Sequence, residues 1–186
     1  MVVQDYDTVL RVMQKRRSVR RYGRKTVSDA LLDKLLKAAE LAPSAGNLQA
    51  RDFVLVRDSN MKHELAEAAY GQFFIAMAPV VLVGCANIAR SRIAYGQRAE
   101  LYAVQDATIA ASYMQLAAEA LDIATCWIGA FDEKRVSRAL KIPLDVRPVL
   151  LLPVGYPDET PEPRVRMDPS RFSHHELWGS SGSVNT

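Results

Sequence analysis

The most restrictive feature of the sequence is the stretch 97–121, which is apolar on nearly every side. Its apolar residues recur at spacings of three and four, which predicts one long helix. They are Ala103, Ala107, Ala110, Met114, Ala117 and Leu121. Ala111, Leu116 and Ala118 make much of the opposite side apolar as well. Such a helix must be buried all round, so it is either central or covered on one face by a second subunit. Because small alanines let another helix approach closely, the pattern indicates a homodimer.

Shorter patterns on both sides of this stretch alternate between helices and apolar strands. Helices are predicted over 7–15, over 29–41 with Ser28 or Asp29 as the cap, over 59–70 with Ser59 as the cap, and over 132–140 with Asp132 as the cap. The predicted strands are 53–56, 79–84, 123–128 and 149–154. Since these strands are apolar throughout, helices should cover both faces of the sheet, which indicates an α+β fold.

Composition limits the class of protein. The 186 residues, 49% hydrophobic and 24% charged, fit one globular domain and exclude a disordered chain. We expect this domain over residues 1–178 and a flexible tail over 179–186. No repeat is found, and no apolar run reaches the roughly 18 residues of a membrane helix. The start of the chain does not resemble a signal peptide, and Cys85 and Cys126 are too few for a disulfide framework, so we expect a cytoplasmic protein.

Positive charge is concentrated in residues 11–25, which hold eight basic residues and no acidic one. The whole chain has 24 basic and 21 acidic residues, so the rest of it is acidic overall. Such a cluster favours a dense anion, which is a phosphate, a nucleic acid or an anionic membrane. The alternative is a solvated basic face.

Several catalytic motifs are absent from the sequence. There is no GxGxxG fingerprint, no phosphate-binding P-loop, no HExxH and no GxSxG. His174 and His175 are adjacent, which does not favour shared metal ligation. If the protein is an enzyme, its reactive group therefore comes from a bound cofactor.

Three separated stretches resemble motifs of the FMN-dependent nitroreductase family. They are 16–22 (RRSVRRY), 42–49 (APSAGNLQ) and 125–132 (TCWIGAFD), and weaker matches extend the resemblance over residues 9–178. On this basis the chain is identified as a member of the family. The resemblance implies a central mixed, mainly antiparallel sheet flanked by helices on both faces. It also implies a homodimer with the long helix at the interface and FMN bound between the subunits.

By this resemblance, Arg16, Arg17 and Ser18 hold the FMN phosphate, and Arg164 and Arg166 close over it from the C-terminal segment. Guanidinium groups match the geometry of a phosphate dianion because they donate two parallel hydrogen bonds. An Arg-x-Arg pair in a proline-rich segment can also be simply solvated.

Two further positions of the resemblance concern the chemistry of the flavin ring. Arg20 could reach the pyrimidine side, where a cation favours the reduced, negatively charged flavin. Gly129 and Ala130 follow a predicted strand and would bring a backbone N–H to flavin N5. Arg20 and Gly129 are therefore the predicted catalytic residues.

The loop after the second helix supplies the remaining contacts implied by the resemblance. Pro43, Ser44 and Ala45 would reach the flavin of the other subunit, while the amides of Asn47 and Gln49 suit ribityl hydroxyls or ring edges. Ordinary turn formation by the same residues is the alternative.

This sequence departs from the family pattern in three places. Ala50-Arg51 follows Gln49 where many relatives have Pro-Trp, Tyr113 stands in place of an asparagine, and 122–124 replaces Gly-Leu-Gly. These changes concern the substrate range more than FMN binding.

The predicted function is hydride transfer from NAD(P)H, through flavin N5, to a small nitroaromatic or quinone-like acceptor by a ping-pong mechanism. A reductive dehalogenase-like enzyme, with 85–100 as its lid, and a non-catalytic FMN-binding or redox-sensing protein are the alternatives. A nucleic-acid arm over 11–25 is disfavoured because aromatic stacking groups are scarce there. We expect neither a nucleic acid nor a membrane as partner.

Overall fold

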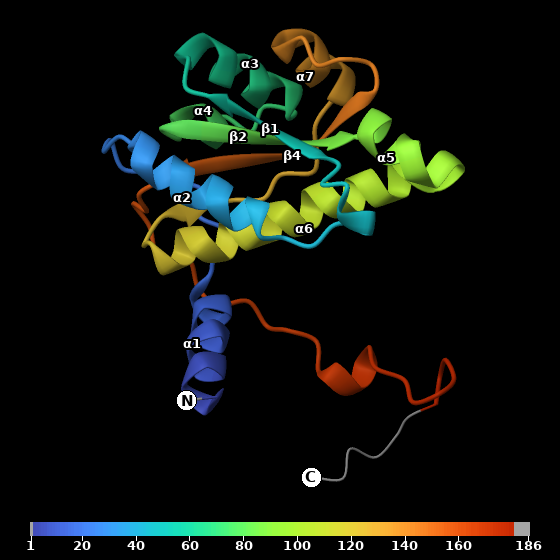
Figure 1. Ribbon diagram of the computed structural model, residues 1–186. Coiled ribbons are helices and arrows are strands. Elements are labelled where there is room, and N and C mark those ends of the chain that lie inside the picture. The colour runs from blue at the N-terminus through green and yellow to red at the C-terminus, as the bar shows by residue number, and fades with distance from the viewer. Residues whose placement is uncertain (1, 181–186) are drawn as a thin grey trace.

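A computed structural model describes residues 2–180 and contains a four-stranded sheet between two layers of helices (Figure 1). The strand order is β1 (Arg51–Val56), β2 (Val80–Asn87), β4 (Val146–Gly155) and β3 (Ala124–Thr125), and all these neighbours are antiparallel. An isolated parallel bridge joins Ser18 to Thr125, which makes the sheet mixed. The predicted fold class is confirmed. Of the predicted tail, 181–186 lies outside the described residues.

Helices cover both faces of the sheet, as the apolar strands predict. On one face lie α2 (Asp29–Glu40) and α6 (Ala99–Ala120); on the other lie α3 (Ser59–Ala68), α4 (Phe74–Met77) and α7 (Glu133–Leu140) (Figure 1). Alternate residues of β2 enter the two layers, because successive side chains of a strand point to opposite faces.

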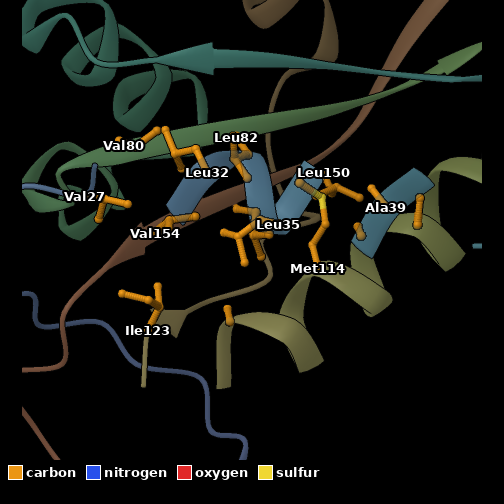
Figure 2. Packing of buried hydrophobic residues seen from close by; sticks show 14 of the residues in the cluster. Val27, Leu32, Leu35, Ala39, Val80, Leu82, Met114, Ile123, Leu150 and Val154 are labelled. Atoms are coloured by element: carbon orange, nitrogen blue, oxygen red, sulfur yellow. The ribbon is translucent and has the colours of Figure 1, made fainter. Parts of the chain in front are cut away.

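The core between the sheet, α2 and α6 is the part of the fold that the helix periodicity predicts best. Leu32 and Leu35 of α2 and Met114 of α6 pack with Leu82 and Leu150 of the central strands, and all five are at most 2% exposed (Figure 2). Burial of one such side chain stabilises the fold by roughly 1.5–3 kcal/mol.

The predicted strand 123–128 is only partly correct, since β3 ends at Thr125 and contact with β4 resumes at Ile128. Ile128 and Leu151 exchange both backbone hydrogen bonds, at 3.0 and 2.9 Å. The same register would place Cys126 opposite Pro153 in a second hydrogen-bonded pair. Proline has no N–H to donate, so the ladder is interrupted at that point.

Other boundaries also differ from the predictions. The first helix, α1, begins at Val2 rather than at residue 7 and ends at Lys15. Asp58, not Ser59, caps α3, because its carboxylate accepts the Met61 N–H at 2.8 Å. The stretch 85–100, considered as a lid, forms the end of β2, the unpredicted helix α5 (Ile88–Tyr95) and a 3-10 turn before α6.

Within one chain, α6 is buried on one side only, so the chain by itself does not bury the helix all round, and cover by a second subunit stays a prediction. Leu101, Ile109 and Tyr113 are each more than a third exposed on the open side. Helix α1 projects from the body of the molecule (Figure 1), and its Val9 and Met13 are at least half exposed. Among residues 2–180, no helix combines the length and the apolar character needed to cross a membrane.

Candidate functional site

The basic segment that follows α1 lies beside β3 and the loop after it. The Val19 N–H donates to the Thr125 carbonyl at 3.1 Å, next to the parallel bridge at Ser18. Burial raises the pKa of the Cys126 thiol, and this is opposed by the positive charges of Arg20 and Arg16 and by a hydrogen bond with Ser18. The first and third sequence motifs, far apart in the chain, therefore meet at this end of the sheet.

The C-terminal segment brings two more arginines to the same end. Arg164 and Arg166 line a cavity of about 280 Å³ together with Arg17, and no acidic residue lines it. One nitrogen of Arg17, Nη1, donates to carbonyls at the end of α1, including that of Lys15 at 3.1 Å. Arg17 thus caps the C-terminal end of α1 and also lines the cavity. The structure therefore brings together three arginines that the sequence places in two distant segments.

Glu159 lies beside the basic segment, and sequence analysis did not predict its role there. Its Oε1 accepts the backbone N–H of Arg20 at 2.5 Å and that of Arg21 at 3.1 Å. The carboxylate therefore fixes the backbone of the basic segment against the start of the C-terminal segment. An acidic residue in a proline-rich stretch carries no sequence signal for this contact.

Gly129 and Ala130 are exposed at the end of the loop that follows β3. The Ala130 carbonyl accepts a hydrogen bond from Gln72 Nε2 at 3.2 Å. A Cβ atom on Gly129 would lie 3.8 Å from Trp127 Nε1, which is an ordinary van der Waals contact. Nothing within the described part of the chain therefore requires a glycine at this position, and its backbone is open to a ligand.

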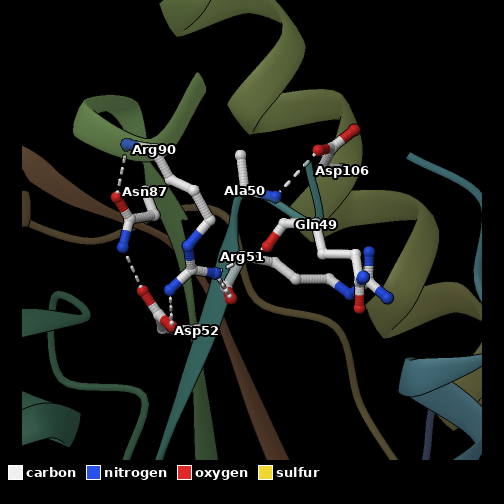
Figure 3. Close-up of polar contacts among 7 residues, drawn as sticks. All are labelled: Gln49, Ala50, Arg51, Asp52, Asn87, Arg90 and Asp106. Atoms are coloured by element: carbon white, nitrogen blue, oxygen red, sulfur yellow. Dashed lines mark hydrogen bonds and ion pairs between the residues drawn. The ribbon is translucent and has the colours of Figure 1, made fainter. Parts of the chain in front are cut away.

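The loop 43–49 lies elsewhere and is held by a buried carboxylate of α6 (Figure 3). Asp106 is 2% exposed, and its two oxygens accept the N–H of Ala45 at 2.9 Å and of Ala50 at 3.0 Å. The Ser44 hydroxyl accepts the Gln49 N–H at 3.0 Å. Sequence analysis missed the role of Asp106, although it is the single acidic residue among the buried positions of α6.

Arg90 of α5 holds the other side of this loop (Figure 3). Its Nη1 donates to the carbonyls of Gln49 at 2.6 Å and Arg51 at 3.0 Å, and its Nη2 pairs with Asp52 at 3.0 Å. Within the loop, Asn47 and Gln49 have φ angles of 54° and 51°, a left-handed conformation that is uncommon outside glycine. The hydrogen bonds from Asp106 and Arg90 therefore hold a backbone conformation that residues other than glycine disfavour.

Arg51, one of the departures from the family pattern, is 8% exposed and lies at the same end. Its Nη2 donates to the carbonyls of Ala39 at 2.9 Å and Glu40 at 3.1 Å. These are among the last carbonyls of α2, which have no partner inside the helix. The arginine thus ties the end of α2 to the start of β1.

The two predicted parts of the site lie at opposite ends of the sheet. Arg51 is aligned with Ala86 and, through it, with Arg147 of β4, whereas Thr125 is aligned with Val154 of β4. Seven residues of β4 separate these positions, which corresponds to about 23 Å along a strand. One chain does not bring the loop 43–49 to the basic segment.

Comparison with known proteins identifies the family. The model of the nitroreductase family matches residues 13–76 and 68–156. The chain belongs to the nitroreductase family. It is 34% identical over 174 residues to a putative NADH dehydrogenase/NAD(P)H nitroreductase of Methanothermobacter thermautotrophicus, with 91% of this chain and 87% of the relative covered. It is 30% identical to an FMN reductase [NAD(P)H] of Bacillus subtilis, with 91% and 74% covered.

Solved structures of this family share the fold. NfrA2 of B. megaterium superposes with a TM-score of 0.86 at 32% identity, covering 91% of this chain and 74% of that one. The family membership predicted from the three motifs is therefore confirmed.

A larger cavity of this nitroreductase family member, about 810 Å³, lies between α7 and the start of β4 and contains none of the predicted site residues. Its Arg147 is already paired with Glu133 and Glu100, both at 2.8 Å. These hydrogen bonds raise the pKa of Arg147, and the negative charges of the two carboxylates offset its positive charge. This cavity is not the site that the motifs indicate.

Proposed function

We propose that the protein is a homodimeric, FMN-dependent oxidoreductase that takes hydride from NAD(P)H and gives it to a small oxidised acceptor. Relatives named FMN reductase and NAD(P)H nitroreductase support this proposal. The observation that carries it is the separation of the two half-sites. Residues 16–18 lie beside Thr125 at the Val154 end of β4, and 126–130 follow the outer edge of β4 from there. The loop 43–49 leads into β1 on the opposite edge of the sheet, so a complete site would need the loop of a second copy.

The charges at the basic end fit the phosphate dianion of FMN. Arg17, Arg164 and Arg166 line a cavity that has no acidic residue, and Arg16 and Ser18 lie nearby, beside Cys126. Charge-assisted hydrogen bonds from guanidinium groups suit such an anion. These five residues would hold the phosphate.

Two further groups would face the flavin ring. The exposed backbone of Gly129 and Ala130 leaves room for close approach, and the guanidinium of Arg20 lies over the Phe74 ring at 5.7 Å, with its backbone fixed by Glu159. A cation in that place stabilises negative charge on a reduced ring. Arg20 and Gly129 are the catalytic residues of the proposal.

The partner copy would supply Pro43, Ser44, Ala45, Asn47 and Gln49. Asp106 and Arg90 fix this loop before any cofactor binds, so the partner offers a rigid wall. The open sides of α1 and α6 provide apolar surface for the contact between the copies.

Bound FMN would supply hydride transfer at N5. NAD(P)H and a nitroaromatic or quinone-like acceptor would then use the same open face in turn, which is a ping-pong mechanism. Cys85 and Cys126 are free and buried, and the reducing cytoplasm is the compartment we propose.

The decisive test is the visible spectrum of the purified protein, followed by anaerobic addition of NADH or NADPH. The proposal requires a flavin absorbance that bleaches with at least one nucleotide and returns with the acceptor. A flavin that neither nucleotide bleaches would establish a non-catalytic FMN protein instead.

Mixed dimers test the shared site. One copy would carry Arg164→Gln with Arg166→Gln, and the other would carry Asp106→Ala. A mixed dimer has one site with both defects and one intact site, so we expect half of the wild-type FMN content. If both sites of the mixed dimer are equally weakened, each site belongs to a single chain.

A further inference from the structure

Lys62 of α3 is a buried cation whose surroundings the proposed function does not explain. It is 9% exposed, and its Nζ donates one hydrogen bond, to the Ala78 carbonyl at 2.6 Å. Among residues 2–180, no carboxylate lies within ion-pair distance of this amino group. A buried ammonium group without an anionic partner is costly, because desolvation is not repaid by ion pairing.

Lys62 lines a cavity of about 320 Å³ whose other charged residues are also basic, and Ala78, whose carbonyl accepts the bond from Nζ, lines it too. The other basic residues are Arg24 and Arg57, Thr26 adds a hydroxyl, and no acidic residue lines this cavity. Two acidic groups near these residues are already engaged. Asp58 caps α3, and Asp29 pairs with Nη2 of Arg57, whose Nη1 and Nε make no hydrogen bond with other residues of the described range.

Arg24 belongs to the basic run 11–25, so this run is divided between two places in the fold. The Gly23 N–H donates to the Tyr156 carbonyl at 2.9 Å, which holds the chain just before Arg24 beside the residue that follows β4. Lys25 lies over the Tyr156 ring at 4.1 Å. The side chains of Arg24 and Thr26 make no hydrogen bond with any other residue of the described range, so their donors remain available for a ligand.

We propose that this cavity is a second anion site, which binds a phosphate or sulfate group through Lys62, Arg24 and Arg57. An ammonium donates three hydrogen bonds and a guanidinium donates in parallel pairs, which together suit a tetrahedral oxyanion. The volume is at the lower end of small-molecule sites, so the ligand is a small phosphorylated or sulfated compound. This site does not depend on the flavin or on the dimer.

Titration calorimetry with inorganic phosphate tests the proposal, at constant ionic strength and with protein saturated with FMN so that the flavin phosphate site is filled. We expect one saturable phosphate site per chain. Lys62→Met keeps the side-chain length, and Arg24→Gln changes an exposed side chain that does not support the fold. Each should weaken binding by about tenfold or more, as the loss of a charge-assisted hydrogen bond predicts.

Lys34→Gln, at an exposed lysine of α2, is the matched control and should leave phosphate binding unchanged. Absence of saturable binding, or equal weakening by all three substitutions, would overturn the proposal. A protein that does not bind FMN would refute the proposed function. The titration is then run on the flavin-free protein, where phosphate binding that Lys62→Met weakens and Arg164→Gln with Arg166→Gln leaves unchanged still reports on this cavity.

The source of the phosphate group is separated by steady-state kinetics. If the 2′-phosphate of NADPH occupies the site, Arg24→Gln raises the KM for NADPH and not for NADH. If a separate phosphorylated compound occupies it, the two KM values of Arg24→Gln match those of the wild type, while phosphate binding is still lost.

Discussion

The two ends of the sheet differ in whether their charged side chains have partners within the chain. At the basic end, Arg16, Arg164 and Arg166 make no ion pair within the described chain and face outward or into a cavity. At the other end, Asp106 accepts the N–H groups of Ala45 and Ala50, and Arg90 donates to the carbonyls of Gln49 and Arg51. In the proposed site, one half would thus be completed by its ligand, whereas the hydrogen bonds of the other half form within the chain. This difference predicts which substitutions affect cofactor affinity and which affect stability.

The largest effect on stability is expected at the end of the sheet that holds the loop 43–49. Asp106→Ala leaves the buried N–H of Ala50 and the half-buried N–H of Ala45 without acceptors. An unsatisfied buried group costs roughly 1–3 kcal/mol, and the half-buried one costs less. We expect the free energy of unfolding of the flavin-free protein to fall by about 3 kcal/mol in urea titrations. Asp106→Asn retains one acceptor and should lose less. If both variants unfold like the wild type, the carboxylate does not hold the loop.

The opposite behaviour is expected at the basic end. Arg164→Gln combined with Arg166→Gln should raise the FMN dissociation constant by about tenfold to a hundredfold, since each charge-assisted bond is worth about 1.5 kcal/mol or more. The flavin-free protein should unfold as the wild type does. Fluorescence quenching of FMN measures the affinity, and Arg21→Gln, at an exposed neighbour, serves as control. A loss of stability without a loss of affinity would contradict the comparison.

Alkaline pH should lower the free energy of unfolding through Cys85, which is aligned with Asp52 on β1. Burial raises its pKa from 9.0 to about 12. Between these values the unfolded thiol loses its proton while the native thiol keeps it, so stability present below pH 9 is lost as pH rises. The expected loss from this group is about 1.4 kcal/mol at pH 10. Cys85→Ala should remove that part of the pH dependence, and an identical pH profile in the variant would exclude this cause.

The smallest change in stability is expected for Gly129→Ala. The added methyl group meets only Trp127 at an ordinary distance, so the free energy of unfolding should change by less than about 0.5 kcal/mol. FMN affinity or the rate of flavin reduction should nevertheless fall, because the methyl group stands where the ring would approach the backbone. Urea titration and stopped-flow reduction with NADH measure the two effects. Unchanged binding and reduction would place the flavin away from Gly129.

Local patterns predicted the elements that depend only on near neighbours in the chain. The helix predicted over 29–41 is observed over 29–40, and the cap at Asp132 is confirmed by its bond to the Arg135 N–H. The strand 123–128 failed because its length depends on a partner, Pro153, that the local sequence does not name. Periodicity reports which face of an element is apolar, and it does not report which residue lies opposite.

The sequence by itself was enough to identify the family, because three family motifs occur in order. It also showed a concentrated run of basic residues and no metal or hydrolytic motif. Only the tertiary structure showed that Ser18 lies beside Thr125 at the Val154 end of β4. The loop 43–49 leads into β1, whose first residue is aligned with Arg147, about 23 Å away along β4.

The tertiary structure also showed that the carboxylates of Asp106 and Glu159 accept backbone N–H groups. Arg24 lines a different cavity from Arg17, although both belong to the basic run 11–25. The physical reason is that charge and apolar content belong to each residue by itself, whereas burial and hydrogen-bond partners arise from strand pairing and layer packing between distant segments.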